Sequence, residues 1–245
     1  MGRVKGFTLI ELLVVISIIG LLVALLLPAL SSAREMSKRA VCLSGMRQLA
    51  IGTTLYADDY NNWMPVDYIR DTQGFTPTGV AGRAMFWNKW TNLGLIFSAS
   101  TGPLKGHGYI SDPQAFFCPS VYESQPNEGY AYYQSLDAFE DPRRSGWIVY
   151  HSYIYRASPP VEGTTGFWRL DENPNACFLS DKIFNTTGTA MKQGHGVDGV
   201  NAAYTDGHAR WIRDERIYNQ LGSVSMTSPQ LSFMTNQLFE LLDDH

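Results

Sequence analysis

The sequence is poor in cysteine and in charged residues, and each shortage excludes a class of protein. Three cysteines in 245 residues are too few for a disulfide-built scaffold, and no CxxC pair is present, which excludes zinc ribbons and thioredoxin-like motifs. Charged residues make up 17% of the chain, against a usual share of about 25%. With 19 basic and 23 acidic residues, the chain also lacks the basic excess that is typical of nucleic-acid-binding domains.

The short motifs of the commonest enzymes are missing as well. The sequence contains no glycine-rich phosphate-binding loop, no GxSxG nucleophile and no HExxH zinc pair. A metal hydrolase would have to use His195 and His208, which lie thirteen residues apart across an expected loop. We therefore predict that the protein is not an enzyme and holds no catalytic metal or organic cofactor.

One long apolar run stands near the start of the chain. Residues 7–30 contain a single charge, Glu11, and a single proline, Pro28. A helix of this length spans about 36 Å, enough for a hydrocarbon core of about 30 Å. A secretory signal peptide has a shorter apolar region followed by a small-x-small cleavage site, and this segment has neither feature. The run therefore predicts one membrane-spanning helix.

The beginning of this run has a specific pattern. A leader that contains Arg3 and Lys5 is followed by Gly-Phe-Thr-Leu-Ile-Glu at residues 6–11. A carboxylate inside a membrane segment is unfavourable unless it lies near the headgroups or has a partner. The string resembles the prepilin signature of type IV pilins and type II secretion pseudopilins. The resemblance implies that a prepilin peptidase cuts between Gly6 and Phe7 and methylates the new amine of Phe7.

The same resemblance assigns roles to two further residues of the apolar run. Glu11 would neutralise the terminal amine of a neighbouring subunit in a filament, where an unpaired charge would be strongly unfavourable. Pro28 falls where the family places its helix-kinking proline. The implied fold is α+β, with a long N-terminal helix packed on a small antiparallel sheet with long loops.

The predicted organisation has four parts: a leader at 1–6, a membrane helix at 7–30, an amphipathic continuation of the helix at 31–59 and an extracytoplasmic head at 60–245. The continuation has two neighbouring apolar stripes, which we expect to pack on the head. The residues of these stripes are Met36, Ala40 and Leu43, and Cys42, Met46, Leu49 and Tyr56. The sequence Tyr60-Asn61-Asn62 should end the helix.

The clearest local signal in the head is a hairpin. Residues 200–205 and 208–212 are separated by Asp206-Gly207, a dipeptide that supplies the positive φ angles of a two-residue turn. Alternation places Asn201, Ala203 and Thr205 on one face of the first strand and Val200, Ala202 and Tyr204 on the other. At least one of Tyr204 and Trp211 should anchor the hairpin. Elsewhere we expect a short helix at 88–98, strands at 146–155 and 176–180, and a helix at 228–243.

His195 followed by Asp206-Gly207 is similar to a pattern after which a large pseudopilin-like group is named. The usual spacer in that group has nine residues, and here it has ten. We expect His195 to hydrogen-bond near the turn as a structural clasp. Because some pseudopilins bind calcium in a C-terminal loop, Asp198, Asn201 and Asp206 are candidates for calcium ligands.

Two arrangements of the cysteines stay open. Cys42 on the helix and Cys118 before Pro119 could form a disulfide in an oxidising compartment, with Cys177 as a free, buried thiol. All three could equally be unpaired and buried, because cysteine packs well as a small hydrophobic residue.

These features predict a structural subunit, pilin-like or pseudopilin-like, of a type IV filament or a type II secretion-type assembly. It would lie in the cytoplasmic (inner) membrane as a single-pass protein with its C-terminal head outside the cytoplasm. Its expected partners are the prepilin peptidase, other pilin-like subunits or copies of itself, an inner-membrane assembly platform and membrane lipid, but no nucleic acid. The alternative is a monomeric membrane-tethered domain that binds a surface glycan through exposed aromatic residues.

Overall fold

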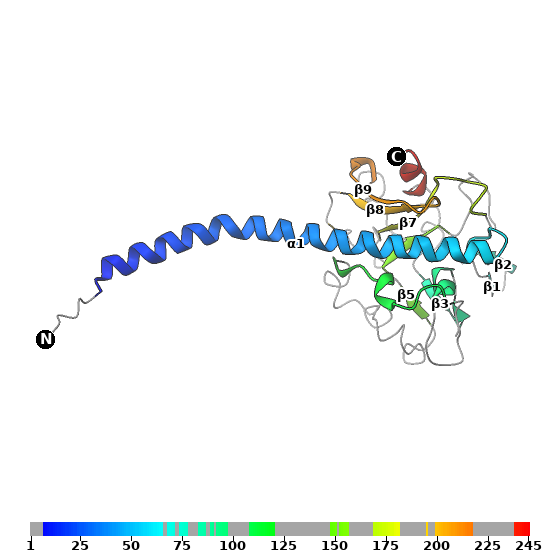
Figure 1. Ribbon diagram of the computed structural model, residues 1–245, viewed down its shortest axis with the longest axis horizontal. Coiled ribbons are helices and arrows are strands. Elements are labelled where there is room, and N and C mark those ends of the chain that lie inside the picture. The colour runs from blue at the N-terminus through cyan, green and yellow to red at the C-terminus, as the bar shows by residue number, and fades with distance from the viewer. Residues whose placement is uncertain are drawn as a thin grey trace. The chain divides into compact units, whose positions relative to one another are not determined.

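A computed structural model of the chain is drawn in Figure 1. It describes residues 7–65, 68–71, 74–77, 83–86, 89–90, 92–97, 108–120, 148–150, 152–156, 169–181, 195, 199–217 and 238–245. The chain divides into two compact units, Met1–Lys38 and Arg39–His245. The predicted leader at 1–6 lies outside the described residues.

One continuous helix, α1 (Leu9–Asp59), contains both the apolar run and its expected continuation, so the long N-terminal helix is confirmed. Asn61 and Asn62 have φ angles of 53° and 63°, and the Asn62 amide donates to the carbonyl of Ala57 at 2.7 Å. Asparagine tolerates this left-handed conformation, which commonly ends helices. The helix therefore ends at the predicted place.

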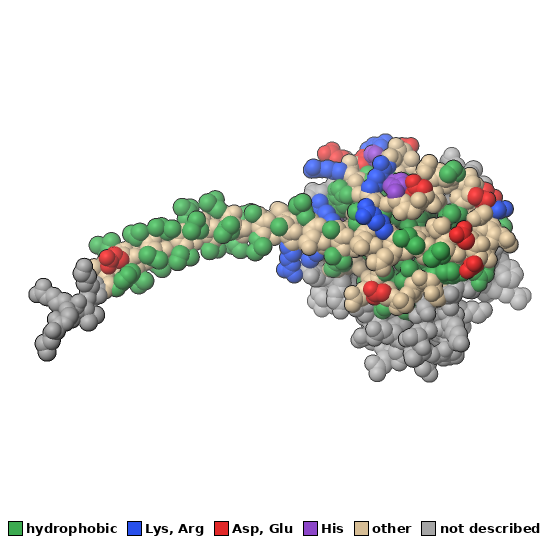
Figure 2. All heavy atoms as spheres, viewed as in Figure 1, with side chains coloured by type: hydrophobic (Ala, Val, Ile, Leu, Met, Phe, Trp, Pro, Cys, Tyr) green, Lys and Arg blue, Asp and Glu red, His purple; other side chains and the backbone are tan. Residues whose placement is uncertain are grey.

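The first part of α1 is apolar on all sides. Its side chains from residue 9 to residue 34 are exposed, and Figure 2 shows hydrophobic side chains along this stretch. Among the described residues, α1 is the one helix long and apolar enough to cross a membrane, and its most apolar window is fully exposed. A helix that is hydrophobic all round needs an apolar environment, which a bilayer or a bundle of similar helices supplies.

The second part of α1 belongs to the head and buries one face. The predicted stripe of Cys42, Met46, Leu49 and Tyr56 is buried, and small residues between them are buried as well. The other predicted stripe is wrong at its start, because Met36 is 67% exposed and Ala40 is exposed too. The amphipathic pattern thus begins to meet the head at Cys42, about one heptad later than the apolar residues alone indicate.

The described strands form three antiparallel sheets. The central sheet has the strand order β6-β7-β8-β9, and the smaller sheets have the orders β1-β2 and β4-β3-β5. The strand bounds are β1 (Tyr68–Asp71), β2 (Gly74–Pro77), β3 (Arg83–Phe86), β4 (Lys89–Trp90), β5 (Ile148–Tyr150), β6 (Tyr153–Tyr155), β7 (Cys177–Asp181), β8 (Val200–Tyr204) and β9 (Ala209–Ile212). The expected α+β arrangement with a small antiparallel sheet is confirmed.

The central sheet lies between two hydrophobic clusters. One face, which includes Leu179 and Ala203, packs with the buried stripe of α1. The other face, which includes Val200, Ala202 and Tyr204, packs with Leu238, Phe239 and Leu242 of a C-terminal helical segment at 238–243. The predicted alternation along β8 is therefore confirmed, and so is Tyr204 as an anchor: it is buried, and its hydroxyl donates to the Leu242 carbonyl at 2.9 Å.

The predicted C-terminal helix is described only over its end. Residues 238–243 are helical, and the rest of the expected span from 228, with Leu231 and Met234, lies outside the described residues.

Two other expected elements differ from the structure. The segment predicted as a helix at 88–98 contains the short strand β4 and a 3-10 helix, η1 (Asn92–Ile96). The strand predicted at 146–155 is divided into β5 and β6, which belong to different sheets. The Ser152 amide, between the two strands, donates to the carbonyl of Phe116 at 3.0 Å. At this contact with a distant segment the chain passes from one sheet to the other. The local sequence does not encode such a contact.

The hairpin of β8 and β9 is confirmed, but its turn is longer than predicted. Tyr204 pairs with His208: its amide donates to the His208 carbonyl at 3.0 Å, and its carbonyl accepts from Gly207 at 2.9 Å. The loop therefore has three residues, and only Gly207 has a positive φ, 87°. A type I turn followed by a left-handed glycine is the usual three-residue solution, because it preserves the twist of the strands.

Gly207→Val tests the backbone requirement of this turn. No atom lies within 4 Å of the place where a Cβ would stand, so the substitution brings strain without a clash. A β-branched residue at positive φ should lower the free energy of unfolding by more than about 1 kcal/mol. Chemical unfolding of the full chain in detergent measures this loss, and Gly207→Asn, which tolerates the same φ, is the matched control. Equal losses for the two variants would contradict this account of the turn.

Candidate functional site

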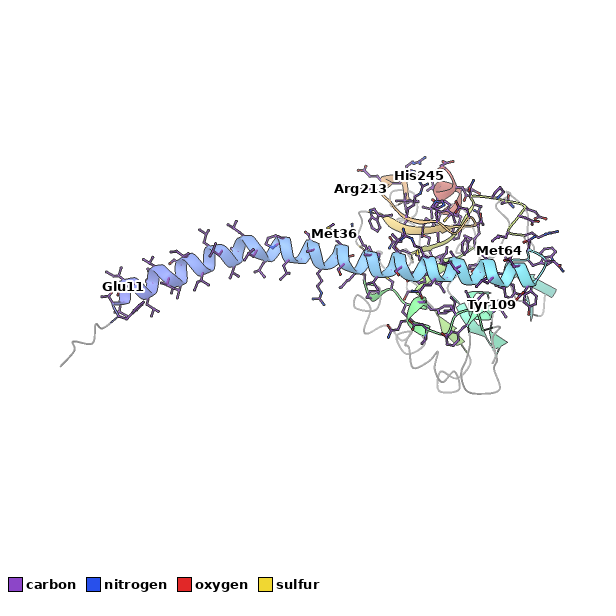
Figure 3. The ribbon with its side chains drawn as sticks, viewed as in Figure 1. Glu11, Met36, Met64, Tyr109, Arg213 and His245 are labelled. Atoms are coloured by element: carbon purple, nitrogen blue, oxygen red, sulfur yellow. A yellow bond between two sulfur atoms is a disulfide. The ribbon has the colours of Figure 1, made fainter. Side chains whose placement is uncertain are left out.

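The N-terminal end of α1 is held by a reciprocal pair of side chains. The Thr8 amide and the Thr8 hydroxyl each donate to Glu11 Oε2 at 2.8 Å, and the Glu11 amide donates to the Thr8 hydroxyl oxygen at 3.2 Å. This is a capping box, in which two backbone amides left over at a helix start are satisfied by side chains. Glu11, labelled in Figure 3, also places its negative charge at the positive end of the helix dipole.

The sequence interpretation did not identify this role of Glu11. The signal was available, since Thr8-Leu9-Ile10-Glu11 has the spacing of a threonine cap followed three residues later by glutamate. Glu11 is thus hydrogen-bonded within its own chain. Pro28, the second residue singled out in this run, lies inside α1, and the helix continues through it.

A disulfide fastens α1 to the head. The structure joins Cys42 of α1 to Cys118, which follows a short 3-10 helix, η2 (Pro113–Phe116), with a Cα–Cα distance of 5.1 Å. Both cysteines are fully buried. Cys177 is free and buried, and burial raises the pKa of its thiol far above the ordinary value. Of the two arrangements that the sequence left open, the structure contains the bridged one.

His195 lies beside this disulfide. Its Nε2 atom is 3.2 Å from Cys118 Sγ and 3.8 Å from Asp181 Oδ2, and the side chain is almost fully buried. The Trp211 ring stands edge-on to it, with ring centroids 5.9 Å apart. Arg39 of α1 donates to the His195 carbonyl at 3.3 Å and covers the Trp211 ring. These contacts bring together β7, β9, α1 and the segment after η2.

The predicted clasp at the Asp206-Gly207 turn is therefore wrong in its location. Trp211, the hairpin residue that His195 contacts, pairs with Asn201 near the open end of the hairpin. The sequence pattern gives only the order of the histidine and the turn. In the structure, strand β8 lies between them and separates the turn from His195. His195 fastens the cysteine region, whereas the turn is held by Asp206, which accepts from the amide and ring of His208.

Asp181 is the acidic member of the His195 cluster. The Asn201 amide donates to its Oδ2 atom at 2.6 Å, while Oδ1 is buried and has no hydrogen-bond partner among the described residues. Burial raises the pKa of Asp181 to about 6, although nearby His195 and Arg39 and the hydrogen bond from Asn201 oppose the increase. A buried carboxylate in this position needs positive or donating neighbours to stay ionised.

The calcium candidates do not form one site. Asn201 lies buried near the start of β8, and Asp206 lies in the exposed turn beyond its end. The strand from Asn201 to Tyr204 alone covers about 10 Å, and Asp206 lies beyond Tyr204 in the turn, so the two side chains do not lie together. Asp198, the third candidate, lies outside the described residues.

The structure also separates the two histidines of the hydrolase alternative. His208 is part of the exposed turn and stacks on Tyr204, whereas His195 is buried among cysteine and aspartate side chains. The two tryptophans whose side chains are described, Trp63 and Trp211, each have an arginine over the ring. One face of each ring is therefore covered by a guanidinium group.

Comparison with known proteins identifies the N-terminal segment. The family described as prokaryotic N-terminal methylation motif matches residues 1–27. The major component of the type IV wide pilus of Thermus thermophilus, PilA4, is 40% identical over 63 residues. The chain is type IV pilin-like.

The likeness covers a limited part of this pilin-like chain. The match to the Thermus protein includes 26% of the chain, and the chain spans about half the length of that relative, 48%. No solved structure is significantly similar to the chain. The apolar helix near the start of the chain and the likeness to a pilin support membrane anchoring.

Counting thiols tests the cysteine arrangement of the pilin-like chain. Under denaturing but non-reducing conditions one thiol, that of Cys177, should react with a thiol reagent, and reduction should raise the number to three. Cys177→Ser should lower each count by one, which identifies the reactive residue. Three reactive thiols before reduction would contradict the Cys42–Cys118 bridge.

Proposed function

We propose that the protein is a structural subunit of a type IV pilin-like filament or of a related secretion assembly, and that it polymerises through α1. The observation that supports this most is the combination of a methylation motif with the exposed, apolar first part of α1, which begins at the Thr8–Glu11 capping box. Such a helix must be covered, first by lipid and then by the helices of other subunits.

The geometry of Glu11 suits this role. Thr8 occupies one carboxylate oxygen, Oε2, and leaves Oε1 without a hydrogen bond in the described part of the chain. Cleavage between Gly6 and Phe7 would leave the amide of Thr8 intact, so the mature chain keeps the capping box. Oε1 can then accept from the methylated amine of Phe7 in a neighbouring subunit, an ion pair that is strong when water is excluded.

The remaining assignments follow from this role. A prepilin peptidase would remove residues 1–6 and methylate Phe7. Other pilin-like subunits, or copies of the chain, and an inner-membrane platform would be the assembly partners. The protein would wait in the inner membrane with its head outside the cytoplasm, the compartment in which a Cys42–Cys118 disulfide persists.

The first test concerns processing. Mass spectrometry of the mature protein should find a chain that begins at Phe7 and carries one added methyl group. Gly6→Val should leave the leader attached, because the resemblance places glycine at the cleavage position. An unmodified chain that still begins at Met1 in the membrane fraction would overturn the proposal.

The second test separates the two roles of Glu11. Glu11→Gln keeps a side chain that can complete the capping box but removes the negative charge, whereas Glu11→Val removes both. If Glu11 pairs with a neighbouring amine, both variants should reach the membrane and neither should assemble into filaments.

Sheared filaments and membrane fractions, probed for the protein, measure assembly and insertion separately. Thr8→Val, which removes the hydroxyl but keeps the charge, is the control and should still assemble. Normal assembly of Glu11→Gln would overturn the ion pair and leave the capping box as the function of Glu11.

A further inference from the structure

The surroundings of the Cys42–Cys118 disulfide contain more polar groups than a disulfide needs. A buried disulfide packs as an apolar group, yet His195 Nε2 is 3.2 Å from Cys118 Sγ, and the Asp181 carboxylate lies beside the imidazole. All these side chains are buried, and Asp181 Oδ1 has no partner in the described part of the molecule. Buried polar groups arranged around a weak acceptor require an explanation beyond packing.

We propose that the reduced form of this chain binds a thiophilic divalent cation, Zn²⁺ as the representative, through Cys42, Cys118 and His195. The three ligand atoms, two Sγ and Nε2, already lie within 4.8 Å of one another. Two thiolates and one imidazole are a common zinc ligand set. The inference is independent of filament assembly.

The distances are close to those of a tetrahedral site. Bond lengths of about 2.3 Å to sulfur and 2.0–2.1 Å to nitrogen place neighbouring ligand atoms about 3.5–3.8 Å apart. His195 Nε2 and Cys118 Sγ, at 3.2 Å, need a small adjustment, and the two sulfur atoms must move apart from bonded contact. A fourth oxygen donor is at hand in Asp181, whose Oδ2 lies 3.8 Å from His195 Nε2.

The charges near the cluster also suit a cation. Two thiolates balance the charge of Zn²⁺, and the Asp181 carboxyl group lies beside the imidazole. The imidazole must be neutral to bind through Nε2. In the oxidised chain the same histidine faces a sulfur atom that has no charge to neutralise.

The connection between Cys42 and Cys118 would have two forms, an oxidised disulfide and a reduced form that binds zinc. A dithiol or phosphine reductant supplies two electrons, the S–S bond breaks, and two protons complete the thiols. Binding of Zn²⁺ then forms two Zn–S bonds and releases both protons. Either the disulfide or the metal ion would hold α1 against the segment that follows η2, so the head keeps the same connection in both redox states.

Cobalt(II) is the probe for this site, because thiolate-bound tetrahedral cobalt has a charge-transfer band and strong visible bands. The full chain in detergent, reduced with a phosphine under anaerobic conditions, should bind one Co²⁺ with these bands. Added Zn²⁺ should abolish them. The oxidised chain should show none.

Variants identify the ligands. Cys42→Ser and Cys118→Ser should each abolish the charge-transfer band, whereas Cys177→Ser should leave it unchanged. His195→Ala should weaken cobalt binding by at least about 100-fold, more than the loss of a supporting residue outside the ligand set. His208→Ala, which removes an exposed histidine of the turn, is the matched control and should bind as the parent does.

Because His195→Ala could also unfold the head, His195→Cys provides a separate measurement. It replaces the imidazole by a third thiolate, so the charge-transfer band should grow while binding is retained. Absence of cobalt bands in the reduced parent chain would overturn the proposal. So would a spectrum that is the same in the parent and in His195→Cys, or one that depends on Cys177.

Discussion

The head depends on the burial of one face of α1 between Cys42 and Ala57. Met46 and Leu49 are fully buried there, and burial of each such side chain contributes about 1.5–3 kcal/mol relative to exposure. Gly45 and Gly52 let the helix approach closely, since a Cβ at Gly52 would stand 2.7 Å from the Ile110 side chain. The Cys42–Cys118 disulfide joins segments 76 residues apart at the start of this face. By the loop-entropy argument such a bridge stabilises by up to about 4 kcal/mol.

The central sheet lies between α1 and the C-terminal segment and packs against both. Its second face is covered by the helical segment at 238–243. An ion pair between buried Arg156 and partly exposed Asp243 fixes that segment: Arg156 donates to Asp243 Oδ2 at 2.6 Å and also to the Cys177 carbonyl. Asp243 Oδ1 in turn accepts from the Cys177 amide. A buried charge with several hydrogen bonds is unfavourable to break, so the C-terminal residues are structurally part of the sheet.

Sequence reasoning succeeded where the signal is local and failed where contacts are distant. The length of α1, its end at the asparagines and the hairpin of β8 and β9 follow from periodicity and turn chemistry. The split of 146–155 into two strands and the position of His195 depend on Phe116, Cys118 and Asp181, which lie far away in the chain. Met36 was wrongly expected to pack on the head, because an apolar stripe on a helix does not indicate at which residue its contact with the head begins. The Thr8 capping box was a local signal that was present and overlooked.

One part of α1 is exposed and the other packs in the head core, and the boundary between the two parts is sharp. Every described side chain of α1 before Cys42 is exposed or partly exposed, and none belongs to either hydrophobic cluster of the head. Changes near Glu11 therefore remove no contact from the head core, because they act on the surface that lipid or other helices must cover. Changes at Cys42 or Leu49 act in the opposite way, through head stability. Under the proposed function, this division lets mutations act on assembly and on folding separately within one continuous helix: the capping box lies at its start and the buried stripe packs on the head.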